Sequence, residues 1–375
     1  MRLVKFEMER LQSTWENRVR YNLSESSVHP MSVRELTGDP VFLERLLDMP
    51  LAYNQSNGTD ELRAAIASFY PGATLDNVEV TNGGSEANFV TVFSMLEPGD
   101  EVVVILPNYG QIWGLVNSLG MITRSSTLRE DRKWAPDLDE LGAAASDRTR
   151  MIVVTNPNNP TGAILTAAEM EAIARIAARS GAWILADEIY QGSERDGVTT
   201  ASFWGKYDRV IVTNGLSKAF GLPGLRIGWI VAPQDPIARM WSYHDYTTIA
   251  PGTLSDTLAR IALSPEGRAR CWERTRSICR ENFPLLRAWL ESHGGLFHMV
   301  EPRAGAIAYL SYDLPLNSTE LIERLLREKS VLVVPGDHFG MDRYLRIGYG
   351  PPPEYLREAL ELVHEVLESA AAAGK

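Results

Sequence analysis

One lysine in this chain lies in a setting suited to nucleophilic chemistry. Lys218 belongs to residues 214–229, which read NGLSKAFGLPGLRIGW and place Ser217 beside it and Arg226 eight positions later. An amine attacks a carbonyl only when it is unprotonated, which favours small neighbours and partial desolvation. A hydroxyl and a guanidinium nearby are groups that bind phosphate. Together these residues predict a lysine that forms a Schiff base with a phosphate-bearing carbonyl compound, a description that fits pyridoxal phosphate.

A lone lysine in a glycine-rich loop is ordinarily a solvated side chain, so this interpretation depends on other motifs. Residues 81–88 (TNGGSEAN) follow a short apolar run and combine glycines with a helix start, which exposes backbone N–H groups to an anion. Residues 156–162 (NPNNPTG) predict a rigid turn that aims a side-chain amide. Each pattern is also typical of an ordinary turn between two elements.

The fourth motif, residues 187–190 (DEIY), places an acid at the end of an apolar run. A carboxylate in such surroundings is costly unless a cation accompanies it, although the same residue could simply cap a helix. A protonated pyridine nitrogen is such a cation, and it makes the ring an electron sink. Asp187 therefore agrees with the cofactor that Lys218 suggests.

The elements around these motifs predict an α/β fold. Residues 101–106, 151–155, 182–187 and 209–213 are unbroken apolar, β-branched runs typical of strands covered on both faces. Helical patterns such as residues 166–179 alternate with them, which indicates a mostly parallel sheet. Ligands bind beyond the carboxyl ends of such strands, which is where the four motifs lie.

The C-terminal part predicts a second, smaller α+β unit. A long helical region after about residue 255 leads to three further strands and a final helix from residue 353. Those strands are expected at residues 305–310, 330–334 and 344–347. We expect a large cofactor-binding domain of residues 40–270 and a small domain built from residues 1–39 and 271–375.

Composition excludes several classes of function. The net charge of −11 argues against general nucleic-acid binding, and no apolar run reaches the ~18 residues of a membrane span. Cys271 and Cys279 show no disulfide or zinc pattern, and no metal site is expected. The first 20 residues lack the apolar core of a signal peptide. We therefore expect a cytoplasmic protein.

The order and spacing of the four motifs resemble the class I/II aminotransferases, which are fold-type I pyridoxal-phosphate enzymes. The resemblance extends over almost the whole chain. It implies that Lys218 carries the cofactor and moves the Cα proton, and that Asp187 pairs with the pyridine nitrogen. It also implies that Tyr190 and Asn159 bond the phenolic oxygen and that Tyr109 stacks on the ring. The phosphate site that it implies consists of Gly84, Ser85, Glu86, Ser217 and Arg226.

The resemblance further implies groups for the substrate and for a second subunit. Arg346, in the run YLRIG, occupies the position that binds the substrate α-carboxylate in the family, and the resemblance also implies that Asn159 binds substrate. Tyr53 resembles the tyrosine that reaches the phosphate of a neighbouring subunit. The family pattern therefore implies a homodimer with shared active sites.

The N-terminal phrase at residues 21–30 (YNLSESSVHP) departs from the usual family wording. It resembles a narrower branch, that of capreomycidine synthase and the pyridoxal-phosphate arginine oxidases and hydroxylases, whose members handle a guanidinium side chain. Glu25 and Asp245 are the acids that could hold such a cation. The alternative is that Glu25 is solvated and Asp245 caps a helix.

We therefore expect an aminotransferase that moves the amino group of an L-amino acid to a 2-oxo acid. The alternative within enzymes is arginine oxidation, hydroxylation or capreomycidine-synthase-like chemistry on a guanidinium amino acid. A pyridoxal-phosphate sensing domain of a regulator is a third, remote reading. Such regulators carry an N-terminal DNA-binding unit, whereas only about 20 residues precede the enzyme-like segment and the chain is acidic.

Overall fold

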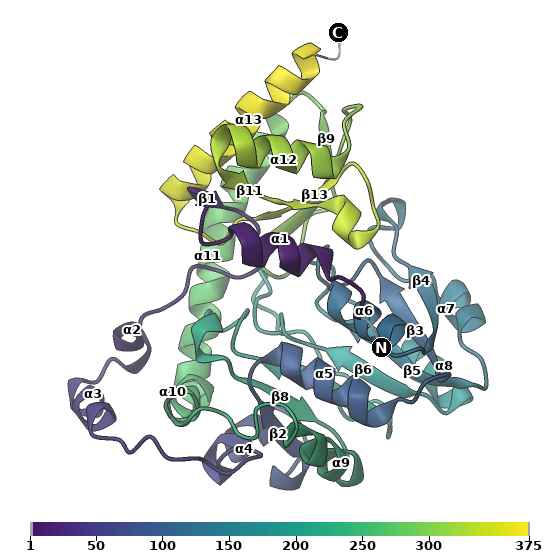
Figure 1. Ribbon diagram of the computed structural model, residues 1–375, viewed down its shortest axis with the longest axis vertical. Coiled ribbons are helices and arrows are strands. Elements are labelled where there is room, and N and C mark those ends of the chain that lie inside the picture. The colour runs from purple at the N-terminus through teal and green to yellow at the C-terminus, as the bar shows by residue number, and fades with distance from the viewer. Residues whose placement is uncertain (1–2, 374–375) are drawn as a thin grey trace.

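A seven-stranded sheet forms the centre of the larger part of the molecule (Figure 1). The computed structural model describes residues 3–373, so residues 1–2 and 374–375 of the expected small domain lie outside the described residues. The strand order is β2-β8-β7-β6-β5-β3-β4, and β8 runs antiparallel to both of its neighbours. The strands are β2 (Val78–Thr81), β3 (Glu101–Leu106), β4 (Ile122–Thr127), β5 (Thr149–Thr155), β6 (Trp183–Asp187), β7 (Val210–Gly215) and β8 (Gly228–Val231). The expected α/β fold with a mostly parallel sheet is confirmed.

The unbroken apolar runs form strands because both faces of the sheet are covered. Along β3, Val102 and Val104 belong to one buried cluster, whereas Val103 and Ile105 belong to another. Alternate side chains of a strand point to opposite faces, so each cluster fills one face. The helices around the sheet are α4 (Asp60–Ala67), α5 (Gly84–Met95), α6 (Gly110–Ser118), α7 (Leu138–Ala144), α8 (Ala167–Ser180), α9 (Gln234–His244) and α10 (Thr253–Leu263), with the short turns η1 (Leu75–Asn77), η2 (Glu130–Arg132) and η3 (Pro223–Leu225).

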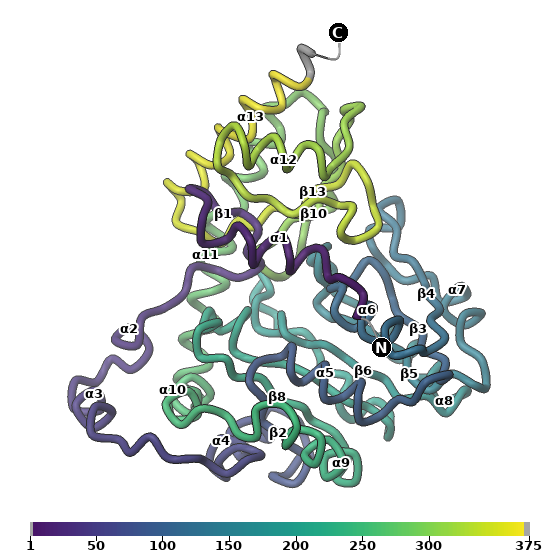
Figure 2. Tube along the Cα trace, in the orientation of Figure 1, coloured from purple at the N-terminus to yellow at the C-terminus, as the bar shows by residue number. Residues whose placement is uncertain are grey.

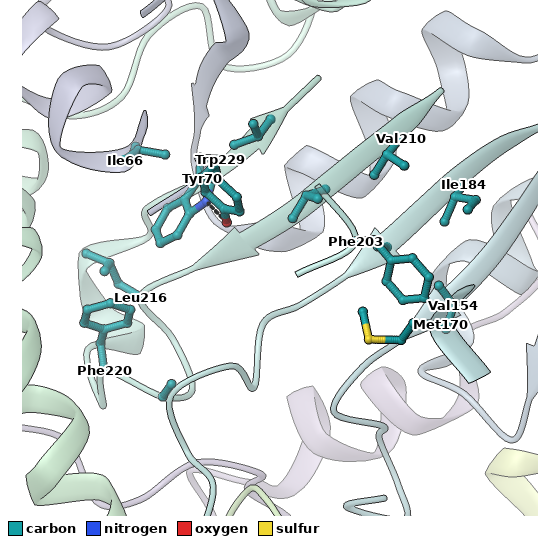
Figure 3. Packing of buried hydrophobic residues seen from close by; sticks show 14 of the residues in the cluster. Ile66, Tyr70, Val154, Met170, Ile184, Phe203, Val210, Leu216, Phe220 and Trp229 are labelled. Carbon is teal, nitrogen blue, oxygen red and sulfur yellow. Dashed lines mark hydrogen bonds between the residues drawn. The ribbon is translucent and has the colours of Figure 1, made fainter. Parts of the chain in front are cut away.

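The cluster that contains Val103 and Ile105 also contains Tyr70, Phe220 and Trp229, which lie close to the lysine motif in sequence or in space. Trp229 on β8 is fully buried and donates a hydrogen bond of 3.0 Å to the hydroxyl of Tyr70 (Figure 3). Phe220, two residues after Lys218, packs against Trp229 with ring centroids 6.5 Å apart. A buried indole N–H is costly without an acceptor, so this bond fixes the core beneath the lysine loop.

The smaller part combines two sheets with three helices. The antiparallel sheet has the order β12-β13-β10-β9, and β1 pairs with β11 in parallel. The elements are β1 (Tyr21–Asn22), β9 (Phe297–Met299), β10 (Ile307–Tyr312), β11 (Val331–Leu332), β12 (Val334–Pro335), β13 (Tyr344–Gly348), α11 (Pro265–Glu291), α12 (Ser318–Lys329), η4 (Gly336–Phe339) and α13 (Pro353–Ala373). The strand expected at residues 330–334 is divided, because β11 pairs with β1 whereas β12 pairs with β13.

The helix α11 joins the two parts. It is 27 residues long, and Cys271 packs in the core of the larger part while Cys279 packs in the core of the smaller part. Both cysteines are free. The change from one core to the other thus falls within a continuous helix, which explains why no flexible linker is visible in the sequence.

The N-terminal segment takes two different courses. Helix α1 (Glu7–Trp15) lies between the two parts, whereas α2 (Val33–Thr37) and α3 (Pro40–Leu47) project away from the body (Figures 1 and 2). No helix within residues 3–373 is both long enough and apolar enough to cross a membrane.

Candidate active site

The four motifs meet in one cavity of about 410 Å³. They meet because β2, β5, β6 and β7 end at the same edge of the sheet, and each motif follows one of these strands. The expected site residues that line this cavity are Glu25, Gly84, Ser85, Tyr109, Asn159, Asp187, Tyr190, Ser217, Lys218, Arg226 and Arg346.

Lys218 faces a carboxylate across the cavity. Its Nζ lies 3.5 Å from Oε1 of Glu25. Burial is the largest single effect and would lower the pKa of Lys218, but electrostatic interactions with Glu25, Tyr190 and Glu9 together outweigh it, so the pKa is raised. The charge of Lys218 correspondingly lowers the pKa of Glu25. The N-terminal phrase is therefore in direct contact with the lysine motif.

Asp187 is the last residue of β6, and its buried carboxylate is held by two donors. Asn88 Nδ2 donates to Oδ2 over 3.1 Å, and the backbone N–H of Ile189 donates to Oδ1 over 3.1 Å. Thr213 donates to Oδ1 of Asn88 over 2.8 Å, which turns the amide so that its N–H₂ faces Asp187. Burial raises the pKa of Asp187, while these hydrogen bonds favour the charged form.

An anion cradle lies at the start of α5. Arg226 Nη1 donates to Ser217 Oγ over 3.3 Å, and its guanidinium packs against Gly83. A Cβ on Gly83 would lie 2.3 Å from Nη2 of Arg226, and the φ of +94° also favours glycine. The N-terminus of α5, the hydroxyl and the guanidinium together form an arrangement that suits a phosphate.

The structure differs from the expectation for Glu86. Its side chain does not line the cavity but accepts hydrogen bonds from the backbone N–H of Asn82 and, over 2.8 Å, from the hydroxyl of Thr248. A carboxylate directed at a phosphate would repel it, so only the backbone of Glu86 could contribute to the cradle.

Arg346 on β13 is buried and lines the same cavity. Nη1 donates to Oδ1 of Asn159 over 3.0 Å, and Nη2 donates to the carbonyl of Ser24 over 2.6 Å. Within residues 3–373 its Nε has no partner. A Cβ on Gly348 would lie 2.0 Å from the carbonyl oxygen of Glu25, so glycine lets the N-terminal phrase approach β13. This places a guanidinium with spare hydrogen-bonding capacity in the cavity.

Two tyrosines complete the walls. Tyr109 donates to Oε1 of Glu9 over 2.7 Å and packs edge-on against Phe6, with ring centroids 5.0 Å apart. Tyr190 is buried, and burial raises its pKa, so its hydroxyl stays protonated.

Like the side chain of Glu86, Tyr53 and Asp245 do not line the cavity of their own chain, and Tyr53 was expected at the site of a neighbouring subunit. Tyr53 is 89% exposed and lies beside residues 250–255. Asp245 is the exposed C-cap residue of α9 and lines no part of the cavity. For Asp245 the arrangement agrees with the alternative of a residue at a helix end.

Sequence reasoning missed several residues that the fold adds to the site. Helix α1 contributes Glu9 and Gln12 to the wall, and Glu16 follows directly after it. Asn88 was visible only as part of the glycine motif. The sequence did carry a weak indication of its position. Residues 84–88 begin a helix after a strand, which places Asn88 one helical turn beyond Gly84 in the cradle.

The residues present fit pyridoxal phosphate. The anion cradle suits the phosphate, the buried Asp187 suits a pyridinium, and Lys218 lines the same cavity. Arg346 offers a planar fork for a carboxylate.

Comparisons with known proteins agree with this fit. Residues 48–363 match the family model described as aminotransferase class I and II. The chain is 34% identical to capreomycidine synthase of Streptomyces vinaceus over 353 residues, which is 93% of this chain and 90% of the relative. It is 32% identical to the aspartate/prephenate aminotransferase of Thermus thermophilus over 327 residues, 85% of this chain and 84% of the relative. A PLP-dependent aminotransferase from Streptococcus suis superposes with a TM-score of 0.92 at 31% identity, covering 99% of each chain. This chain therefore belongs to the class I and II aminotransferases and is a fold-type I enzyme that uses pyridoxal phosphate.

Proposed function

We propose that Lys218, Asp187 and Arg346 carry the amino transfer from an L-amino acid to a 2-oxo acid. When bound, pyridoxal phosphate supplies an electron sink for the bond that breaks at Cα. Arg346 binds the α-carboxylate of the substrate through its planar fork. Nζ of Lys218 removes the Cα proton as general base. Asp187, kept charged by Asn88 and Ile189, holds a proton on the ring nitrogen.

The other cavity residues support these roles. Ser217, Arg226, Gly84 and Ser85 hold the phosphate, with the backbone of Glu86 beside them. Tyr190 and Asn159 would hydrogen-bond the phenolic oxygen of the cofactor, and Tyr109 would pack on its ring. The single observation that carries the proposal is the convergence of Lys218, Asp187 and Arg346 on one cavity.

We further propose that the amino donor has a cationic side chain. Glu9, Glu16 and Glu25 line the same cavity, so three carboxylates border the space beside Arg346. Burial raises the pKa of Glu16, and the charges of Glu25 and Glu9 raise it further, which marks a region where negative charge is concentrated. A guanidinium or ammonium group would relieve that repulsion. Asp245 could contribute to such a site only from a second subunit, because it lies outside the cavity of its own chain.

Substitution of Glu25 should change specificity rather than abolish the reaction. We expect Glu25→Gln to lower kcat/KM for L-arginine relative to L-norleucine by about 10- to 100-fold, since a hydrogen bond to a charged group contributes roughly 1.5–3 kcal/mol. Half-reaction spectra with both amino acids measure the ratio. The control is Glu171→Gln on the exposed face of α8, which should leave the ratio unchanged. An unchanged ratio for Glu25→Gln would show that Glu25 is only a solvated partner of Lys218.

A second candidate function is oxidation, hydroxylation or cyclisation of a guanidinium amino acid. It is favoured by the 34% identity with capreomycidine synthase and by the acidic wall. Incubation with L-arginine separates the candidates. Amino transfer needs a 2-oxo acid and consumes no dioxygen, and an oxidase consumes dioxygen without a 2-oxo acid. A cyclase consumes neither, leaves L-arginine unchanged, and instead consumes an arginine that bears a β-hydroxyl, which leaves as water when the ring closes. Unaltered spectra with all amino acids would support the remote reading of a sensing domain without turnover.

We also propose that the enzyme is a cytoplasmic homodimer with shared sites. The segment around α3 projects from the body and exposes Leu47 (79%), Leu51 (79%) and Tyr53 (89%), an apolar surface that a second copy would cover (Figure 2). The free Cys271 and Cys279 are compatible with a reducing cytoplasm.

A mixing experiment tests the shared site. Tyr53→Ala and Lys218→Ala should each impair turnover, whereas hybrid dimers formed from both variants should contain one intact site and regain activity. Sedimentation equilibrium should give twice the chain mass of 41.7 kDa. Activity that never exceeds the sum of the separate variants would contradict a site shared through Tyr53.

A further inference from the structure

A buried charged cluster lies behind the glycine turn that begins α5, and the amino-transfer steps do not use it. Its centre is His244 on α9, whose side chain is fully buried. His244 Nδ1 lies 2.7 Å from Oε1 of Glu79 on β2, and Nε2 lies 3.3 Å from Oε2 of Glu86 on α5. Glu79 is also fully buried. A histidine enclosed by two carboxylates is favoured in its protonated form.

The cluster is connected to the backbone of the glycine turn. Glu86 accepts the backbone N–H of Asn82, which immediately precedes Gly83. Thr248 donates to Glu86 over 2.8 Å and lies 3.1 Å from Nε2 of His244. Side chains from β2, α5 and α9 are therefore linked through hydrogen bonds to Asn82, the residue that precedes the turn.

The turn has no freedom to shift without disturbing the anion cradle. Gly83 packs so closely on Arg226 that a Cβ would lie 2.3 Å from Nη2. On the other side, a Cβ on Gly228 would lie 2.4 Å from the carbonyl carbon of Gly83. Movement of the Asn82 backbone would therefore move the N–H groups of Gly84 and Ser85 relative to the guanidinium.

We propose that His244 is a positioning residue for the cofactor phosphate: held between Glu79 and Glu86, it fixes the turn at Asn82 and Gly83 and neutralises the Glu86 carboxylate in the first turn of α5. This inference rests on the proposed phosphate site. His244 does not touch the phosphate; it acts through Glu86 and the backbone of the turn. Without the imidazolium charge, Glu86 would repel the phosphate and hold the turn less firmly.

Because the role of His244 depends on its positive charge, phosphate binding is expected to depend on pH. Burial opposes protonation of His244, but hydrogen bonds and charge from Glu79 and Glu86 raise its pKa to about 9. Arg63 on α4 is a further charged group near the cluster, and it acts on Glu79. The pKa of His244 is above its ordinary value of 6.5. The contribution of protonated His244 to phosphate binding is therefore complete at lower pH and is lost as the pH rises through about 9.

The experiment compares pyridoxal phosphate with pyridoxal, which lacks the phosphate, as ligands of the full chain. We expect His244→Gln to lower the preference for pyridoxal phosphate by at least about 10-fold, while affinity for pyridoxal changes little. A histidine with only a structural role would lower both affinities together. The control is His298→Gln on β9, an exposed histidine, which should leave both unchanged. In the wild type the preference should fall as the pH rises through about 9, and in His244→Gln this step should be absent.

Arg226→Gln separates this inference from the phosphate site itself. If Arg226→Gln leaves the preference unchanged, the phosphate-site assignment is wrong. If Arg226→Gln lowers the preference but His244→Gln does not, the role of His244 is overturned. Should His244→Gln fail to fold, Glu86→Gln keeps the acceptor for Asn82 and removes the charge. In that case a changed pH profile of the preference supports the proposal, and an unchanged profile refutes it.

Discussion

The Lys218→Ala protein is expected to lack the visible absorbance band of lysine-bound cofactor and to lose turnover. Lys218 lines the cavity with Asp187 and Arg346, and no other lysine lines it among the described residues. A positioned proton-transfer group contributes up to about 10⁴-fold, and loss of the covalent attachment adds to this, so kcat should fall by about 10⁴-fold or more. Absorbance spectra and single-turnover assays with an amino acid measure both effects.

Two further variants show whether the loss is specific to the amine of Lys218. Lys218→Arg keeps the positive charge beside Glu25 but cannot attack a carbonyl, so it should be as inactive as the alanine variant. Lys206→Ala, in the loop before β7 and outside the cavity, should behave as the wild type. Persistence of both the band and the turnover in Lys218→Ala would refute the central assignment.

Substitution of Asp187 by asparagine is expected to have the second largest effect. Asparagine keeps the shape of the side chain but removes the charge that would stabilise a protonated ring nitrogen. The loss of one preorganised electrostatic group costs about 10²–10³-fold in kcat. Rapid-kinetic measurement of Cα-proton exchange reports this step directly. Exchange at the wild-type rate would exclude an electrostatic role for Asp187.

Thr213 donates to Asn88 and Asn88 donates to Asp187, and this hydrogen-bond relay predicts a graded series of effects when its members are substituted. Asn88→Ala removes one donor from the carboxylate, so the pKa of Asp187 should rise further and the acid limb of the pH–rate profile should move to higher pH. Thr213→Val should cause a smaller shift in the same direction, because it leaves the Asn88 amide in place but frees it to turn. Thr213→Ser keeps the hydroxyl and should restore the wild-type profile. Equal profiles for all variants would mean that Asp187 is held without the relay.

The positions of the strand ends, and the functional residues that follow them, could be predicted from the sequence because both depend on local sequence patterns and on general rules for parallel sheets. Apolar β-branched runs identify buried parallel strands, and the chemistry of such sheets is found at their carboxyl ends. Asp187 and Lys218 follow from this reasoning, since one ends β6 and the other follows β7 closely. Arg346 lies on β13 of the four-stranded sheet, and only the family resemblance connected it with Asp187 and Lys218.

The remaining details depend on contacts between distant segments. Glu86 lies in the first turn of a helix, where an acid is ordinary, and its orientation is set by Thr248 and His244 about 160 residues away. Glu9 enters the site because α1 lies over the cavity, which no periodicity in residues 7–15 indicates. Asp245 was expected at the substrate pocket and Tyr53 at the site of a neighbouring subunit. Both side chains are exposed, so no contact within the chain fixes what they would bind.

The hydrogen bond between Arg346 and Ser24 joins residues 322 positions apart in the chain. The end of the cavity that contains Arg346 thus closes only after β13 has been synthesised and packed on the N-terminal phrase. During synthesis the chain can expose the cradle and the lysine loop, but it cannot enclose a substrate. The complete site is therefore a property of the finished fold, and by mass action a ligand that contacts both ends of the cavity stabilises the native state.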